Sequence, residues 1–86
     1  MSSDRTLYSI RNESRGMTTI SLNKLVADTL QESLPDVHAW VQNAFDRVTA
    51  MKPELSRRQK GDLVRRLSVK EAEKLPRFIE LIADHF

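Results

Sequence analysis

The clearest hydrophobic pattern in the chain runs from residue 37 to residue 51. Apolar residues recur there at steps of three and four, and polar residues fill the positions between them. That spacing places the apolar side chains on one face of a helix. Asp36 stands where an N-cap is expected, and the Lys52-Pro53 pair ends the pattern. We therefore predict an amphipathic helix over residues 36–51, whose core or interface positions are Val37, Trp40, Val41, Ala44, Phe45 and Val48.

Weaker patterns predict further helices on both sides of this one. Leucine and valine at helical spacing predict a helix over about residues 22–34. Pro53 suits the first turn of a helix over about residues 54–67, within which Gly61 costs on the order of 1 kcal/mol relative to alanine and predicts fraying. The expected fold class is therefore mostly α: a compact bundle of three to four helices.

The last of these helices has a capping signal and a breaking signal. Ser68 and Glu71 have the spacing of a capping box, which predicts a helix over about residues 69–85. Pro76 falls in the second turn of that helix and removes a backbone donor. We therefore expect a kink or a restart at Pro76.

Residues 17–23 allow two interpretations. Ile20 and Leu22 alternate with polar residues, which favours a short strand at 18–23 with one apolar face. Alternatively, Ser21 is the N-cap of the helix that follows.

The residues before this stretch are polar and show no helical period. We predict a flexible N-terminal tail over 1–16 and a single helical domain over 17–86. Alternatively, the residues of the tail form a short strand, or an arm that becomes ordered when it binds a partner.

Size and composition exclude most kinds of catalysis. A chain of 86 residues forms one domain at most and leaves no room for a cleft between two lobes. It has no cysteine, only two histidines far apart in sequence, and only two glycines, so neither a thiol nucleophile, a metal site nor a phosphate-binding glycine loop is expected. We predict a protein that is not an enzyme and needs no cofactor, metal or small-molecule substrate. Without cysteines or a long apolar run, we expect a cytoplasmic protein that does not span a membrane.

Positive charge is concentrated in one segment. Residues 52–71 carry seven Lys and Arg residues against three acidic ones. On a helix, the side chains of Arg58, Arg65 and Arg66 would share about a third of the circumference, flanked by Arg57 and Lys60. Such a surface can neutralise phosphates of a nucleic acid, although it can equally be a solvated helix face that keeps a small protein soluble.

Two stretches, MTTISLN and DVHAWVQNAFDRV, together resemble the ribbon-helix-helix family of DNA-binding regulators and antitoxins over residues 17–48. In that family two chains pair their strands into a ribbon that enters the major groove, and the helices form the dimer core. The resemblance implies that Thr19, Ser21 and Asn23 face the base edges and that the helix N-terminus near Asp36 meets a phosphate. A basic residue is common on that face in the family, but none is present in residues 18–23.

Two functions are therefore considered. The first is a small DNA-binding transcriptional regulator or antitoxin-like protein, which uses the ribbon at 18–23 or, failing that, the basic helix at 55–67. One strand alone leaves its edge unpaired, so this hypothesis predicts a homodimer. The alternative is an all-helical protein–protein interaction module, such as a phage- or plasmid-borne adaptor or inhibitor, which binds a partner protein without contacting DNA.

Overall fold

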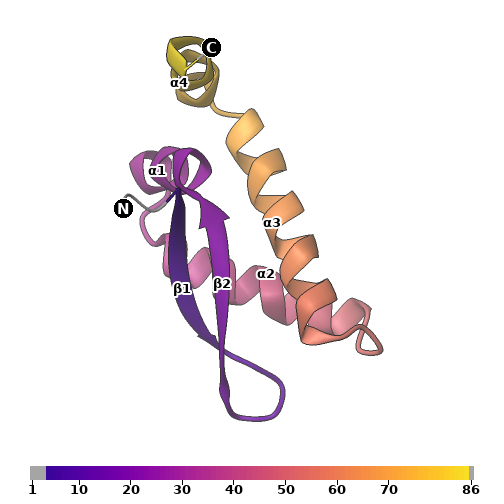
Figure 1. Ribbon diagram of the computed structural model, residues 1–86. Helices are drawn as coiled ribbons and strands as arrows, with labels where there is room; N and C mark the ends of the chain where they lie inside the picture. Colours follow the sequence, from indigo (N-terminus) through magenta and orange to yellow (C-terminus); the bar gives the residue numbers. More distant parts are fainter. Residues whose placement is uncertain (1–3, 86) are drawn as a thin grey trace.

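Within residues 4–85, a β-hairpin comes first and four helices follow it (Figure 1). The computed structural model describes the backbone of residues 4–85, and the side chains of all of these except residues 77, 81, 82, 84 and 85. The elements in chain order are β1 (Arg5–Arg11), β2 (Met17–Asn23), α1 (Lys24–Ser33), α2 (Val37–Met51), α3 (Arg57–Glu73) and α4 (Pro76–His85). The fold is thus mostly α with a short antiparallel β-ribbon.

The two strands pair in an antiparallel register that sets Arg5 opposite Asn23 and Arg11 opposite Met17. Asn12 closes the turn between them, because its backbone N–H donates to the Gly16 carbonyl at 2.9 Å and its side chain accepts from the Gly16 N–H at 3.1 Å. Side chains alternate across the hairpin as in any strand. The even-numbered residues face the helices, and the odd-numbered residues face outward.

The strand β1 corrects the expectation of a flexible tail for residues 4–16 and confirms the alternative of a short strand there; residues 1–3 lie outside the described residues. Tyr8 and Ile10 are buried in the core, and Ile10 is completely inaccessible to solvent. The Tyr8 hydroxyl also accepts a hydrogen bond from the Gln31 side chain of α1 at 3.2 Å. Two alternating apolar residues are too few to predict a strand from the local pattern. β1 is stabilised by its backbone pairing with β2 and by the packing of its inner face against the helices.

The strand expected at 18–23 is confirmed, and it begins one residue earlier, at Met17. The alternative in which Ser21 caps the following helix is wrong, because Ser21 lies inside β2. Asn23 is the N-cap of α1, and its side chain accepts from the backbone N–H of Leu25 at 2.8 Å. An asparagine at this position satisfies a backbone donor that the first helical turn leaves free.

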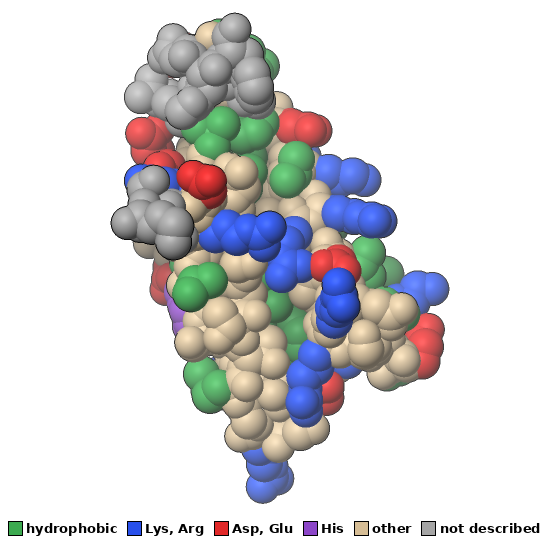
Figure 2. Space-filling view, in the orientation of Figure 1, with side chains coloured by type: hydrophobic (Ala, Val, Ile, Leu, Met, Phe, Trp, Pro, Cys, Tyr) green, Lys and Arg blue, Asp and Glu red, His purple; other side chains and the backbone are tan. Residues whose placement is uncertain are grey.

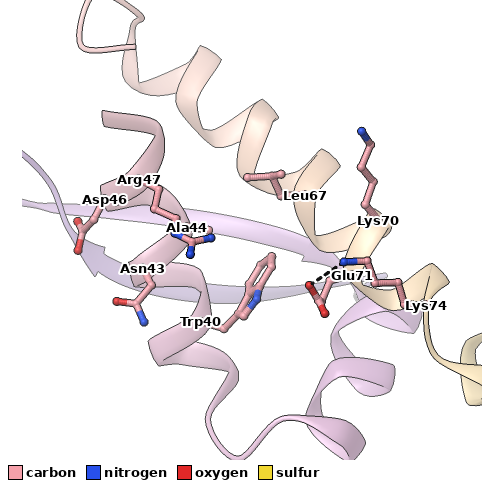
Figure 3. A pocket seen from close by; sticks show the side chains of 9 residues that line it. All are labelled: Trp40, Asn43, Ala44, Asp46, Arg47, Leu67, Lys70, Glu71 and Lys74. Carbon is pink, nitrogen blue, oxygen red and sulfur yellow. Dashed lines mark ion pairs between the residues drawn. The ribbon is translucent and has the colours of Figure 1, made fainter. Parts of the chain in front are cut away.

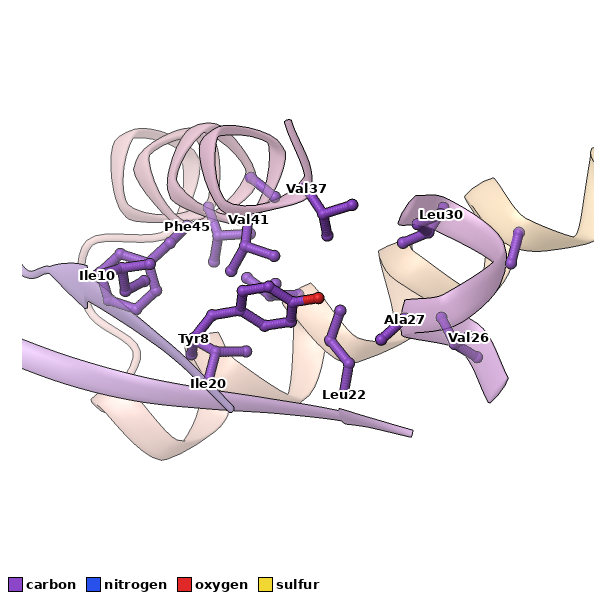
Figure 4. Close-up of a cluster of buried hydrophobic side chains, with 14 of the residues drawn as sticks. Tyr8, Ile10, Ile20, Leu22, Val26, Ala27, Leu30, Val37, Val41 and Phe45 are labelled. Atoms are coloured by element: carbon purple, nitrogen blue, oxygen red, sulfur yellow. The ribbon is translucent and has the colours of Figure 1, made fainter. Parts of the chain in front are cut away.

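The core lies between the inner face of the hairpin and the helices α1, α2 and α3 (Figure 4). The amphipathic helix predicted at 36–51 is confirmed as α2, with Asp36 as its N-cap. Its predicted core positions are buried except Trp40, which packs against the core but stays partly exposed. The remaining buried apolar residues come from the hairpin and the other helices: Tyr8, Ile10, Ile20, Leu22, Val26, Ala27, Leu30, Val64, Ala72 and Phe78.

The predicted division between the third and fourth helices is wrong. α3 begins at Arg57 rather than at 54 and runs unbroken to Glu73. Ser68 is buried in the middle of this helix, and its hydroxyl donates to the Arg65 carbonyl at 2.6 Å instead of capping a new helix. The capping box is formed by Ser56 and Gln59 at the start of α3. The chain restarts as α4 at Pro76, which agrees with the expected effect of a proline.

Gly61 does not interrupt α3, although fraying was expected there. The residue is buried where α3 crosses β2, and a Cβ atom at this position would lie 3.3 Å from Cδ1 of Ile20. The missing side chain therefore lets the helix approach the strand closely, and packing against the hairpin offsets the low helix propensity of glycine.

The burial of β1 can be tested by truncating one side chain on each of its faces. We expect Ile10→Ala to lower the free energy of unfolding by about 2–5 kcal/mol, as for other buried large-to-small substitutions. Leu7→Ala is the matched control, because Leu7 lies on the outer face of the same strand and is 68% exposed. Its effect should stay within about 0.5 kcal/mol. Equal effects of the two substitutions in urea denaturation would contradict the packing of β1.

Candidate nucleic-acid interface

The outer face of the hairpin is a surface formed by the odd-numbered residues of both strands. Four cross-strand pairs make it up, and most of its side chains are polar (Figure 2). All its residues are exposed except Ser21, which is half-buried. The pairs are Arg5 with Asn23, Leu7 with Ser21, Ser9 with Thr19, and Arg11 with Met17.

The three residues that the resemblance assigned to base reading all lie on this outer face, but in different situations. Thr19 is exposed at the centre of the face. Ser21 accepts a hydrogen bond from Nη1 of Arg5 at 3.2 Å. The side chain of Asn23 caps α1, so its oxygen is already engaged.

Two arginines that were not among the predicted site residues reach this face from β1. Arg5 and Arg11 stand at the two ends of β1 with their side chains on the outer face. β2 has no basic residue of its own. Only the alternation of Tyr8 and Ile10 with polar neighbours could have indicated that residues 5–11 form a strand and bring two cations to the ribbon.

Both edges of the hairpin are held by side chains from the helices. On the β1 edge, Gln42 of α2 accepts from the Arg11 N–H at 2.8 Å and donates to the Arg11 carbonyl at 3.0 Å. His38 of the same helix contacts the Ser9 carbonyl through Nε2. On the β2 edge, Nε of Arg65 in α3 donates to the Ser21 carbonyl at 2.9 Å. The strands are therefore paired within one chain, and the helices occupy part of the edges at which another strand would add.

The basic residues predicted to share or flank one face of α3 separate into four environments. Arg58 and Arg66 are exposed, whereas Arg65 lies against β2. Arg57 reaches the hairpin turn, where its Nη2 donates to the Ser14 hydroxyl at 3.0 Å. Lys60 has a side chain only 2% exposed, so it does not lie on the surface where a phosphate could meet it.

Lys60 instead holds the hairpin turn against the core. Its Nζ lies 3.6 Å from Oε1 of Glu13 and 5.9 Å from the centre of the Phe45 ring. Arg57 also pairs with Glu13, at 3.6 Å. A hydrogen bond from its own backbone lowers the pKa of the Glu13 carboxyl, and the charges of Lys60 and Arg57 lower it further. Ion pairing thus ties the turn to the start of α3.

A groove lies between α2 and α3, away from the hairpin face (Figure 3). It has a volume of about 660 Å³, and Trp40, Ala44 and Leu67 form its apolar part. Its rim carries both charges, including an ion pair between Lys74 and Glu71 at 3.8 Å. The partly exposed Trp40 therefore contributes to this groove as well as to the core.

Comparisons with known proteins give no relative for this chain. No protein-family model matches it, and neither the curated proteins nor the solved structures contain a significant match. Its N-terminal hairpin followed by helices is compatible with a ribbon-helix-helix topology. Within the described residues, no group of three or more His, Asp or Glu residues could hold a metal ion, and none of the helices combines the length and the hydrophobicity that a membrane span requires.

The pairing of Glu13 predicts a stability that depends on pH. A carboxyl whose pKa is lower in the folded state stabilises the fold fully above its ordinary pKa of about 4.3, and the effect disappears as the pH falls through the lower folded value. We expect the stability difference between the wild type and Glu13→Gln to be constant near neutral pH and to shrink below about pH 4.

Urea denaturation at stepped pH measures this difference. Glu54→Gln is the control, since Glu54 is an exposed carboxyl in the connection between α2 and α3. A difference for Glu13→Gln that persists unchanged into strong acid would show that the ion pairs do not hold the turn.

Proposed function

We propose that this protein binds duplex DNA by inserting the outer face of its hairpin into the major groove. The observation that carries the proposal is an exposed antiparallel ribbon with arginines at the ends of β1 and hydroxyl side chains at its centre. The major groove admits a two-stranded ribbon. Arginine is the usual partner of guanine there, and serine or threonine can contact any base. Arg11, Ser9 and Thr19 are therefore the proposed base-contacting residues.

The charge around the ribbon supports the same partner. Arg58 and Arg65 occupy one stripe of α3, two helical turns apart, and Arg65 lies directly against β2. These cations, together with the two arginines of β1, favour a polyanion next to the ribbon. Binding that depends on them should weaken steeply as salt rises, because each neutralised phosphate releases counterions.

The proposed role is that of a small transcriptional regulator or antitoxin-like DNA-binding protein. It differs from the ribbon-helix-helix family in how the ribbon is built. In that family each chain contributes one strand, whereas here β1 and β2 belong to the same chain. A homodimer is then not required to form the ribbon, and a second copy would serve to contact a second half-site.

A protein partner is the second candidate, and the groove at Trp40 favours it. Tryptophan and arginine are the residues most enriched at the energetic centres of protein interfaces. Trp40 and Arg47 both line the groove. A partner bound there would leave the outer face of the hairpin uncovered, so the two candidates place their interfaces on different surfaces.

The DNA proposal can be tested with a charge inserted at the centre of the ribbon. Thr19→Glu should weaken binding to a fluorescent duplex at least about tenfold, because a carboxylate would face the phosphates and base edges. Asn43→Glu is the matched control: it adds the same charge at an exposed position of α2, in the groove beside Trp40. It should change the affinity far less. Fluorescence anisotropy at low salt measures both.

Three results would count against the proposal. Wild-type protein that binds no duplex at low salt refutes it. Unchanged affinity for Thr19→Glu would mean that the hairpin does not contact the DNA. Equal losses in the two variants would mean that only the total charge matters.

A further inference from the structure

Two large apolar side chains lie on the otherwise polar outer face of the hairpin. Leu7 is 68% exposed and Met17 is 64% exposed. Both stand at odd-numbered positions of the strands, where a hairpin with one buried face normally carries polar residues. Neither side chain belongs to the core. The packing of the fold therefore does not account for the apolar character of these two positions.

The register of the strands places the two side chains diagonally across the ribbon. Leu7 of β1 is opposite Ser21 of β2, which lies four residues beyond Met17 on the same strand. Met17 itself is opposite Arg11. The two apolar groups are therefore about 13 Å apart along the ribbon at the usual rise of a strand. A cross-strand pair of hydroxyl residues lies between them.

This spacing of apolar groups suits a DNA groove better than a protein surface. The centre of a protein interface is a continuous apolar patch that is depleted of charged residues. Here the two apolar side chains are separated by hydroxyl groups, and Arg5 and Arg11 stand at the ends of β1 on the same face. The major groove has a matching pattern, because each thymine presents its C5 methyl group as an isolated apolar group among hydrogen-bond donors and acceptors.

We infer that Leu7 and Met17 determine specificity by contacting the C5 methyl groups of two thymines. The inference rests on the proposed function, since the contacts require the ribbon to lie in the major groove. A separation of about 13 Å along the ribbon corresponds to about three to four base pairs, given a rise of about 3.4 Å per base pair and the winding of the groove. Because Arg11 is opposite Met17, a guanine is expected next to one of the two thymines.

Replacement of thymine by uracil tests this contact directly. Uracil keeps every hydrogen-bonding group of thymine and lacks only the methyl group. The wild type first selects duplexes from a random-sequence pool at low salt, and each thymine of a recovered duplex is then replaced singly. Replacement at either of two positions, three to four base pairs apart, should weaken binding about two- to fourfold, as for the loss of one buried methyl group. Fluorescence anisotropy measures the affinities.

Serine substitutions assign each methyl group to one side chain. With Leu7→Ser, replacement of one of the two thymines should no longer change the affinity, and replacement of the other should still weaken binding. Met17→Ser should show the converse. Met51→Ser is the matched control, because Met51 is 76% exposed at the end of α2, outside the hairpin. It should keep the response of the wild type at both positions. Urea denaturation checks that the three variants fold, which is expected since none of these side chains is buried.

The possible results separate this inference from the proposed function. Loss of the response at one position in each hairpin variant supports the inference. If the wild type binds DNA with equal affinity for thymine and uracil duplexes, the inference is overturned and the proposed function stands. A response that persists unchanged in both hairpin variants would mean that other residues contact the methyl groups, which overturns the assignment to Leu7 and Met17. If the wild type binds no duplex, the proposed function fails, and the inference fails with it.

Discussion

Pairing of β1 with β2 inside one chain is the constraint on which the rest of the structure depends. An isolated two-stranded hairpin is at best marginally stable in water, so it must pack against a hydrophobic surface. α1, α2 and α3 provide that surface for the even-numbered residues of the two strands. The odd-numbered residues are left facing outward as a consequence of the same alternation. Packing of the inner face of the hairpin against the helices therefore determines which residues form its outer face.

The helices also fix the hairpin through its backbone. Gln42 reaches both backbone groups of Arg11 in β1, and Arg65 reaches the Ser21 carbonyl in β2. The turn is held separately, by the ion pairs of Glu13. Contacts at both edges and at the turn give the ribbon a defined orientation on the helices, which any recognition of a groove requires. Polar residues of α2 and α3 that the sequence pattern places on a solvated surface therefore form hydrogen bonds with the hairpin.

The sequence allowed the helices with strong periodicity to be predicted, but not the contacts between distant segments. α2 was predicted with nearly all its core positions, because its pattern extends over four turns. For residues 5–11 the local pattern favours a flexible tail and leaves a short strand only as the alternative, because the burial of β1 depends on β2 and α2. The prediction that Ser68 caps a helix is wrong, since a capping box is a local signal and burial of α3 against the hairpin and the core outweighs it. The sequence predicts Lys60 as a surface cation, whereas its burial depends on Glu13 and Phe45, which are distant in the sequence.

Of the candidate site, the sequence therefore indicated β2 and the exposed arginines of α3, while the contribution of β1 could be recognised only in the folded structure.

The most direct test of DNA binding by the hairpin is a map of amide chemical-shift changes during titration of the labelled protein with duplex DNA. If the hairpin binds DNA as proposed, the largest changes lie on its outer face, centred on Ser9 and Thr19, and continue to Arg65. Changes centred on the groove around Trp40, with the hairpin unaffected, would contradict it.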